Sequence, residues 1–236
     1  MRKAVKILAF MLVALSLFTS CLETDSPSST SATTTTAQTE QIDSVPPSPS
    51  ALKSMMLSAE NITIQYSLGV VAQSQSTDVT IKREGNKIMI KKETTDKDGN
   101  WTYITRSTVY YDLENNDIYQ HDKDGKFYVS QMEEKFDWQK TLSSYGVLLT
   151  SFGDVFNDDH YVWVEGGEYV APEEVLKQLS ERRGTAYKSM SATLGSIKSS
   201  IGCAMEGRSA SLIVSFRKPG VSFPEAERVG SGVSGL

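Results

Sequence analysis

The sequence predicts an α+β fold: a curved antiparallel β-meander, half-barrel-like, packed on helices and preceded by a signal peptide and a disordered stalk. Three observations support this prediction. Short segments with alternating apolar and polar residues follow one another between residues 62 and 130. Turn-forming sequences separate these segments, and residues with helical spacing come before and after them.

The first twenty residues have the composition of a signal peptide. Basic residues at positions 2, 3 and 6 precede an apolar stretch from Ile7 to Phe18. This stretch is shorter than the ~20 residues that a membrane-spanning helix needs, and it has the length of a secretory core segment. The small residues Thr19 and Ser20 then stand directly before Cys21.

A short apolar segment that ends in small residues and a cysteine resembles the signal of prokaryotic lipoprotein precursors. The resemblance implies that Cys21 is lipidated on its sulfur and becomes the mature N-terminus. It also implies a lipid anchor in the cell membrane or outer membrane, with the domain facing outside the cytoplasm. Phe18 departs from the Leu, Val or Ile usual at its position, so an ordinary signal peptide cut nearby and an uncleaved anchor stay open as alternatives.

The composition divides the chain into four parts. Residues 1–20 form the signal peptide, and residues 21–50 form the lipidated cysteine and a disordered linker rich in Ser, Thr and Pro. The linker has too little apolar surface to offset the entropy of ordering it, so we expect a stalk. Residues 51–228 are enough for one globular α+β domain, and residues 229–236 form a flexible tail.

Charge and cysteine content narrow the class of protein. The formal charge is −5, and loss of the three basic residues at the N-terminus would make it −8, which argues against nucleic-acid partners. Cys203 is the second of two cysteines. Once Cys21 is lipidated, an intramolecular disulfide is excluded, and we expect Cys203 to pack as a small apolar residue.

The predicted elements follow in order along the domain. A short helix is expected around Leu52, and strands are expected at 62–68, 79–81, 88–90, 101–111, 118–121 and 126–130. A helix is predicted over 136–156 and another from Pro172 to Gly184. The segment 187–201 fits either a helix or a strand, and 211–217 fits a last strand.

The leading helix, the strand and turn pattern from Val79 to Ser130 and the helix after it resemble lipoprotein-sorting and lipid-carrier proteins of the LolA/LppX type. The stretches 109–112 and 125–128 carry the resemblance within that pattern. It covers residues 51–156 and implies a curved sheet that holds acyl chains in a cavity. It assigns no role to a particular residue of this chain.

Aromatic side chains are concentrated in one part of the domain, since fifteen lie between Trp101 and Tyr169. One interpretation is a pocket for an acyl chain or another apolar ligand. The alternative is that they are ordinary residues of strands and core, because strands favour aromatic side chains. The candidate pocket residues are Trp101, Tyr103, Tyr110, Tyr119, Tyr128, Trp138 and Trp163.

Catalytic and metal-binding motifs are weak in this chain. His121 and His160 are the only histidines, each beside aspartates, which permits a metal site or, with one of the many serines, a triad. Both histidine clusters look like loops instead. The Asp-x-Asp-Gly sequences at 96–99 and 122–125 lack the remaining ligands of a calcium loop and are better explained as hairpin turns. We therefore expect no enzyme activity, no metal and no cofactor.

These observations predict a membrane-anchored extracytoplasmic lipoprotein that binds or carries a lipid, an acyl chain or a lipoprotein in a cavity of the curved sheet. The alternative is a structural or interaction lipoprotein of the cell envelope without a ligand cavity. A hydrolase is a third hypothesis. A hollow sheet would favour the first, a packed interior with exposed apolar surface the second, and a histidine beside an acid in a cleft the third.

Overall fold

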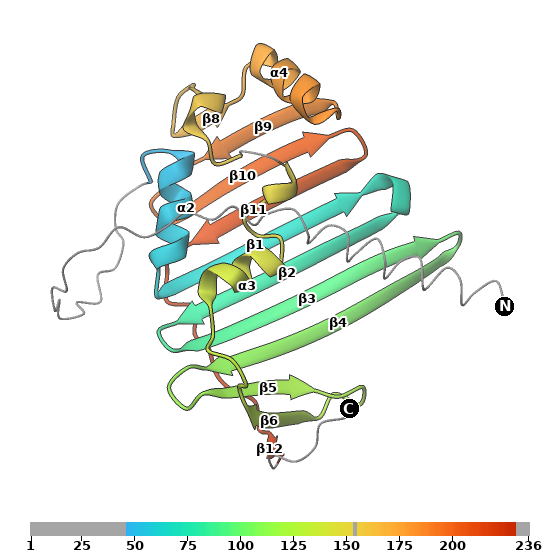
Figure 1. The fold of residues 1–236 in the computed structure, drawn as a ribbon, viewed down its shortest axis with the longest axis vertical. Coiled ribbons are helices and arrows are strands. Elements are labelled where there is room, and N and C mark those ends of the chain that lie inside the picture. Colours follow the sequence, from blue (N-terminus) through green and yellow to red (C-terminus); the bar gives the residue numbers. More distant parts are fainter. Residues whose placement is uncertain (1–45, 153–154, 230–236) are drawn as a thin grey trace, which may run out of the picture. The chain divides into compact units, whose positions relative to one another are not determined.

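The computed structural model describes residues 46–152 and 155–229. They form an α+β fold around one curved, open sheet of twelve strands, as the sequence predicts. The sheet order is β12-β6-β5-β4-β3-β2-β1-β11-β10-β9-β8-β7, so the first strand lies in its middle (Figure 1). The signal peptide, Cys21 and the linker up to residue 45 lie outside the described residues, as does the tail from residue 230.

The predicted meander is confirmed. Adjacent strands from β1 to β6 pair antiparallel in chain order. The turn chemistry is also confirmed, since Gly85 and Gly99 connect long hairpins with φ of 55° and 61°, values that favour glycine. The strands are β1 (Asn61–Val70), β2 (Gln75–Glu84), β3 (Lys87–Asp98), β4 (Trp101–Asp112), β5 (Asp117–His121) and β6 (Phe127–Gln131).

The second half of the chain extends the same sheet on the other side of β1. The ambiguous segment 187–201 forms strands, because its apolar residues alternate with serines and Gly195 interrupts the run. The strands are β7 (Val162–Trp163), β8 (Glu168–Val170), β9 (Tyr187–Thr193), β10 (Lys198–Met205) and β11 (Arg208–Ser215). The last of them pairs antiparallel with β1 and joins the two halves.

Three helices are present among the described residues: α2 (Pro49–Ser58), α3 (Trp138–Ser144) and α4 (Glu173–Arg183). Short 3-10 turns cover Val71–Gln73, Thr150–Phe152 and Asp158–His160. Helix α2 begins at Pro49, with Ser48 as its N-cap, so ordered structure starts a few residues before the expected domain boundary at 51. The helix expected from Pro172 is confirmed as α4, which ends at Gly184 in the left-handed conformation.

The helix predicted over 136–156 is wrong in its length. Helix α3 ends at Ser144, and Gly146 and Leu149 have φ of 75° and 53°, which an α-helix does not allow. A Cβ atom at Gly146 would lie 3.2 Å from the hydroxyl of Tyr66, so the chain turns where it passes close to β1. The apolar residues beyond it are still buried, but they come from turns rather than from one helical face.

The helices α2 and α3 lie over one face of the sheet, which we call the covered face (Figure 1). Strand residues that point to this face pack against Leu52 and Met56 of α2, both fully buried. Trp138 of α3 donates from Nε1 to the carbonyl of Met56 at 3.0 Å and ties the two helices together. The buried strand residues on this face include Ile64, Tyr66, Ile81, Ile88, Ile90, Ile201, Leu212 and Val214.

The chain after β11 crosses the opposite face of the sheet, which we call the open face. Val221 fixes this terminal segment, residues 216–229, to the end of β2 by donating its N–H to the carboxylate of Glu84 at 2.8 Å. Its end forms β12 (Glu227–Arg228), which pairs parallel with β6 and makes the sheet mixed. Part of the β6 edge of the sheet is thereby covered by the terminal segment.

Candidate interaction surface

The seven predicted pocket residues do not line one cavity. Alternation along the strands decides this, because directly paired residues point to the same face. Tyr110 pairs with Tyr119, and both lie on the open face, whereas their neighbour Tyr111 pairs with Ile118 on the covered face. The prediction of a shared pocket is therefore wrong for Tyr110 and Tyr119, which the sheet turns away from the helices.

The structure brings Tyr110 and Tyr119 together in a different cluster. The terminal segment places Phe223 in a parallel stack on Tyr119, with ring centroids 4.9 Å apart. Phe127 packs edge-on against Tyr110 at 5.7 Å. These aromatic side chains hold the terminal segment on the open face, and offset or edge-on aromatic pairs of this kind stabilise packing.

The other five predicted residues are dispersed. Trp101 and Tyr103 lie on the covered face near the start of β4, beyond the helices, and are 72% and 58% exposed. Tyr128 donates its hydroxyl to Asp122 at 3.3 Å. Trp138 belongs to the contact between α2 and α3, and Trp163 is an exposed residue of β7 at the end of the sheet.

The interior beneath the helices is filled by side chains. Phe152, Leu142 and Leu149 are at most 1% exposed and pack into the same core as α2 and the strands. In the part of the chain that the structure describes, one hollow beside α3 and another beside α4 are both open to solvent. Close packing of this kind leaves little room for an acyl chain between the helices and the sheet.

One of these hollows is a groove of about 590 Å³ between the strands β4 to β6 and the chain leading into α3. Its apolar floor consists of Tyr111, Ile118 and Phe136. Its walls are polar and charged, and they include Glu133, Glu134, Lys135, Asp137 and Lys140. The groove can hold a short apolar group, but its rim is hydrated rather than apolar.

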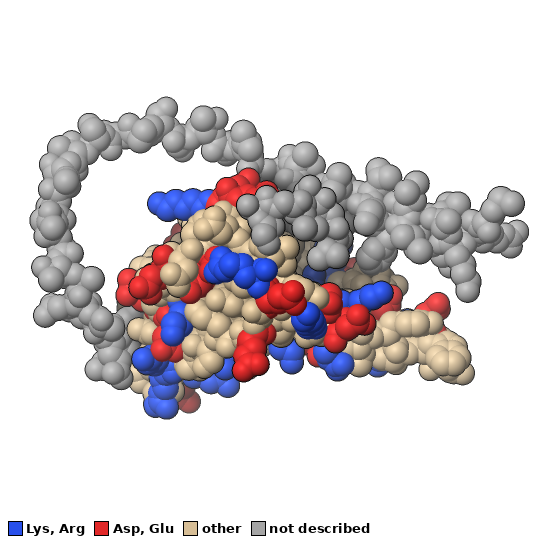
Figure 2. Space-filling view, turned by 90° about the horizontal axis from the view of Figure 1, so that it is seen from below, with Lys and Arg blue, Asp and Glu red and all other residues tan. Residues whose placement is uncertain are grey.

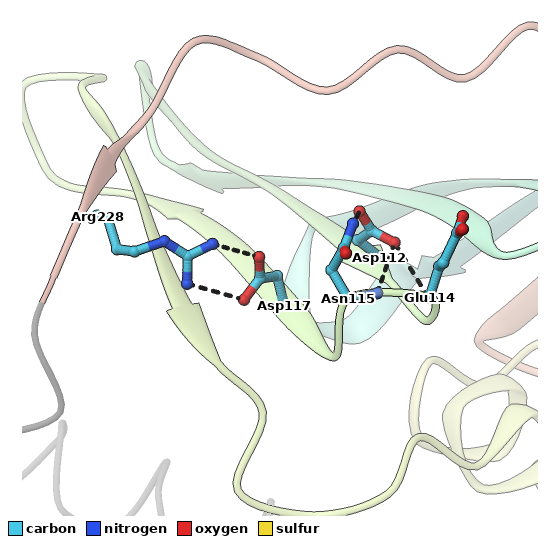
Figure 3. A network of polar contacts seen from close by, with 5 residues as sticks. All are labelled: Asp112, Glu114, Asn115, Asp117 and Arg228. Atoms are coloured by element: carbon cyan, nitrogen blue, oxygen red, sulfur yellow. Dashed lines mark hydrogen bonds and ion pairs between the residues drawn. The ribbon is translucent and has the colours of Figure 1, made fainter.

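A polar network fixes the end of the sheet near β12 (Figure 3). Asp117 is 3% exposed and receives two hydrogen bonds from the guanidinium of Arg228, at 2.6 Å and 3.2 Å. The hydrogen bonding to Asp117, and then the attraction of its negative charge, raise the pKa of the Arg228 guanidinium. Asp112, directly opposite Asp117 in β4, accepts the N–H groups of Glu114 and Asn115 and shapes the turn between β4 and β5.

The histidines and acidic loops have structural partners. In His121, Nε2 accepts the N–H of Thr108 at 3.1 Å and Nδ1 lies 2.9 Å from the carbonyl of Asp122, so both ring nitrogens serve the hairpin. Asp122 accepts the N–H groups of Asp124 and Lys126, as the predicted hairpin turn requires. Among the described residues, no group of three or more metal-ligating side chains comes together.

The carboxylate of Asp158 binds the start of α2. Asp158 accepts hydrogen bonds from the backbone N–H of Ser50 at 2.9 Å and from its hydroxyl. Desolvation by burial, the largest single effect, raises the pKa of Asp158, but the hydrogen bonds from Ser50 and Ser48 together lower it below its usual value. This serine and aspartate pair therefore caps a helix, and His160 lies instead beside Asn157.

Large apolar side chains are exposed at two margins of the sheet. The first margin is the hairpin tip, where the ends of the β1–β2 and β3–β4 hairpins lie side by side because Gln75 pairs with Asp96. The second is the β7 edge, the last strand of the sheet and the residues beside it. The exposed residues are Val71, Trp101, Tyr103 and Ile104 at the tip, and Val162, Trp163, Val164 and Val170 at the edge.

Sequence reasoning selected three of these residues, Trp101, Tyr103 and Trp163, but assigned them to a pocket. The valines of the β7 edge were missed. The run Tyr161–Val164 between acidic residues was the available signal, since a short apolar run bounded by turn-forming residues is typical of a strand. The position of this run at the edge depends on the order of the strands in the sheet, and that order cannot be inferred from the residues of the run alone.

Comparison of the chain with protein families, with curated proteins and with solved structures found no match. Among the described residues, no helix is both long and apolar enough to cross a membrane. The fold and the site together define an open-sheet α+β domain with a packed interior and apolar side chains at two margins of the sheet.

Proposed function

We propose that this protein is a lipid-anchored interaction protein of the cell envelope, facing outside the cytoplasm, that binds a protein partner through the margins of its sheet. One observation carries the proposal: the interior beneath the helices is filled, while large apolar side chains are exposed at the hairpin tip and the β7 edge. Apolar side chains that are exposed together, rather than singly, commonly mark interaction sites on a protein surface.

The sequence supports the location. The apolar stretch from Ile7 to Phe18 and the small residues before Cys21 have the order that lipidation requires in prokaryotic lipoproteins. The predicted linker between Cys21 and α2 gives a domain on such an anchor room to reach a partner at a distance from the lipid surface. Non-enzymatic binding agrees with the structural roles of His121 and of the Ser50–Asp158 pair.

A second candidate function is the binding of a lipid or acyl chain, and the open groove favours it. Tyr111, Ile118 and Phe136 give its floor apolar surface that a ligand could cover. Such a ligand would lie on the surface of the domain rather than in an enclosed cavity. The charged walls of the groove make it a weaker candidate than the exposed margins of the sheet.

Photo-crosslinking in intact cells tests the two functions against each other. A photoreactive residue is placed at Trp101 or Trp163 at the margins, or at Lys140 on the wall of the groove as the matched control. We expect a protein adduct from the two marginal positions and none from position 140. A lipid adduct from position 140, with no protein adduct at the margins, would overturn the proposal and favour the carrier.

Native mass spectrometry of the exported Cys21→Ser chain gives an independent measurement. The substitution removes the proposed site of lipidation, so we expect this variant to leave the membrane fraction and to have the mass of the bare chain. A stoichiometric adduct of lipid mass would contradict the interaction function. A variant whose mass shows that residues 1–20 have been removed, but which still stays in the membrane fraction, would contradict the anchor at Cys21.

A further inference from the structure

The two ends of the sheet are built differently. At one end, β12 covers β6, and ion pairs join Arg228 to Asp117 and Lys126 to Glu227. Seen from this end of the sheet, the surface carries lysines and arginines interspersed with aspartates and glutamates (Figure 2). Charged residues and a covering strand are the usual means by which proteins block an exposed sheet edge. At the other end, β7 is the last strand of the described sheet.

The pairing of β7 with β8 leaves backbone groups directed outward. Val162 pairs with Val170, and Val164 donates its N–H to the carbonyl of Glu168 at 2.8 Å. In an antiparallel pair, alternate residues face the partner strand, so Trp163 between them turns its N–H and C=O to the open edge. A further strand could therefore add to β7 through Trp163 without breaking a bond of the sheet.

The side chains at this edge would contact an added strand on both faces. Trp163 is 62% exposed and lies on the same face as its pair Tyr169. Val162 and Val164 point to the opposite face and are about half exposed. Apolar side chains on both faces of an edge strand give an incoming strand hydrophobic neighbours as well as backbone partners.

The charge around the edge indicates what could add there. Between Asn157 and Leu176 the chain has six acidic residues and no lysine or arginine. Glu165 and Glu168 are exposed and flank the turn from β7 into β8. A second copy of this chain would bring like charges together at the new pair of strands, and an anionic lipid surface would be repelled in the same way.

We propose that the β7 edge receives an extended segment of a partner protein in which lysines or arginines alternate with Val, Ile or Leu, and that this segment adds as a further strand to the twelve that the structure describes. The inference rests on the proposed function, since it names the partner chemistry at one of the two exposed margins. The backbone of Trp163 provides the hydrogen bonds, the apolar side chains provide contact area, and Glu165 and Glu168 select for basic residues.

Fluorescence anisotropy with the full exported Cys21→Ser chain tests the inference. The probe is a labelled peptide of alternating lysine and valine, and the matched control is the same peptide with glutamate in place of lysine. We expect the lysine peptide to bind at least about tenfold more tightly than the glutamate peptide, with a preference that weakens as salt is added. Equal binding of the two peptides would overturn the proposal.

Two sets of variants locate the binding to the edge. Trp163→Pro removes the outward N–H but no hydrogen bond to β8, because proline is tolerated on an edge where the N–H faces solvent. Trp163→Thr removes the indole and keeps the N–H. We expect the proline variant to lose binding and the threonine variant to retain part of it, while both keep the thermal unfolding transition of the parent.

Charge reversal provides the second set. Glu165→Lys with Glu168→Lys is expected to remove the preference for the lysine peptide, whereas Glu114→Lys with Glu206→Lys, the same charge change at exposed residues elsewhere, is expected to leave it unchanged. Loss of preference in both pairs would mean that only net charge matters and would overturn the inference. Protein crosslinks at Trp101 without peptide binding at the β7 edge would refute this inference alone and leave the proposed function standing.

Discussion

At the scale of single residues, the environment of Cys203 shows how the domain keeps a free thiol away from solvent. Its side chain is 3% exposed in β10, on the face that the helices cover. Burial raises the pKa of the thiol to about 12. The reactive thiolate is therefore scarce at neutral pH, and the expected packing of Cys203 as a small apolar residue is confirmed.

Iodoacetamide labelling should reveal this protection. We expect Cys203 in the folded Cys21→Ser chain to react at least about a hundredfold more slowly than in the same chain unfolded in urea. Mass spectrometry of the quenched reaction measures both rates. Labelling at similar rates in the two states would show that β10 opens readily and would contradict the buried position.

Asp158 makes a second prediction at this scale, concerning stability and pH. Its carboxylate binds the start of α2 through Ser50, and Asp158→Ala should reduce the free energy of unfolding by about 1 kcal/mol at pH 7. Because the pKa of Asp158 is lowered in the folded state, its contribution is fully present above the usual pKa of 3.8 and is lost as the pH falls through the folded value.

Urea unfolding of the parent and the Asp158→Ala variant between pH 7 and pH 3 measures this contribution. The difference between the two proteins should shrink only in the acidic part of the range. Asp159→Ala, which removes a neighbouring exposed acid, is the control. A difference that is constant with pH would assign the loss to packing rather than to the charge at the helix start.

At the scale of elements, an ion pair fixes the end of the terminal segment to the sheet, and only one of its two partners is buried. The side chain of Asp117 is 4% exposed, whereas that of Arg228 is 60% exposed. Arg228→Ala would leave the carboxylate of Asp117 buried without its partner, and we expect a lower free energy of unfolding. The loss should be smaller than for a fully buried pair because solvent screens the arginine.

The double variant Asp117→Asn with Arg228→Ala distinguishes the cause. If the loss comes from the uncompensated charge, the double variant should recover part of the stability that Arg228→Ala loses. Urea unfolding curves provide the measurement. Equal stability of the single and double variants would mean that Arg228 acts through packing of its side chain.

The elements also show what a sequence can predict. The strands from β1 to β6 were predictable because alternation and turn residues repeat over many residues. Strands β7, β8 and β12 have two or three residues each, which is too short for a periodic pattern. The long helix at 136–156 was wrong because Gly146, in the left-handed conformation, ends α3 and lets the N–H of Val147 bond back to the carbonyl of Leu142, whereas the apolar spacing continues past this local stop signal.

The candidate site was harder to predict than the fold. Trp101, Tyr103 and Trp163 are recognisable as large apolar residues, but their exposure depends on where the helices stop covering the sheet. The assignment of Tyr110 and Tyr119 to a pocket failed because the aromatic residues alternate between two faces. Only the pairing register shows which face is covered.

At the scale of the whole molecule, the sheet has two halves that meet where β1 pairs with β11. Thr63 pairs with Ser215 across this junction, so forming the pair closes a loop that contains most of the domain. Contacts distant in sequence form late when loop closure limits folding. We therefore expect the hairpins of β1 to β6 to form earlier than this junction.

Folding kinetics test this order. Val214→Ala in β11 should cost about 2 kcal/mol, and most of that cost should appear as faster unfolding. Ile90→Val, within the β2–β4 meander, is expected to slow folding by a larger share of its smaller cost. Stopped-flow folding and unfolding rates at a series of urea concentrations measure how each stability loss is divided between slower folding and faster unfolding. The opposite distribution would mean that the junction forms first.

The central position of β1 also determines how the domain responds to force. The chain enters through Pro47, whose carbonyl accepts the hydroxyl of Tyr169, and continues through α2 into β1. A pull on this end acts along a strand that is bonded on both sides, so many hydrogen bonds must shear at once. A pull on the other end would peel the two-residue strand β12 away one bond at a time. On the proposed anchoring at Cys21, we therefore expect the sheet to resist a load applied through its N-terminal side more strongly than one applied through its C-terminal side.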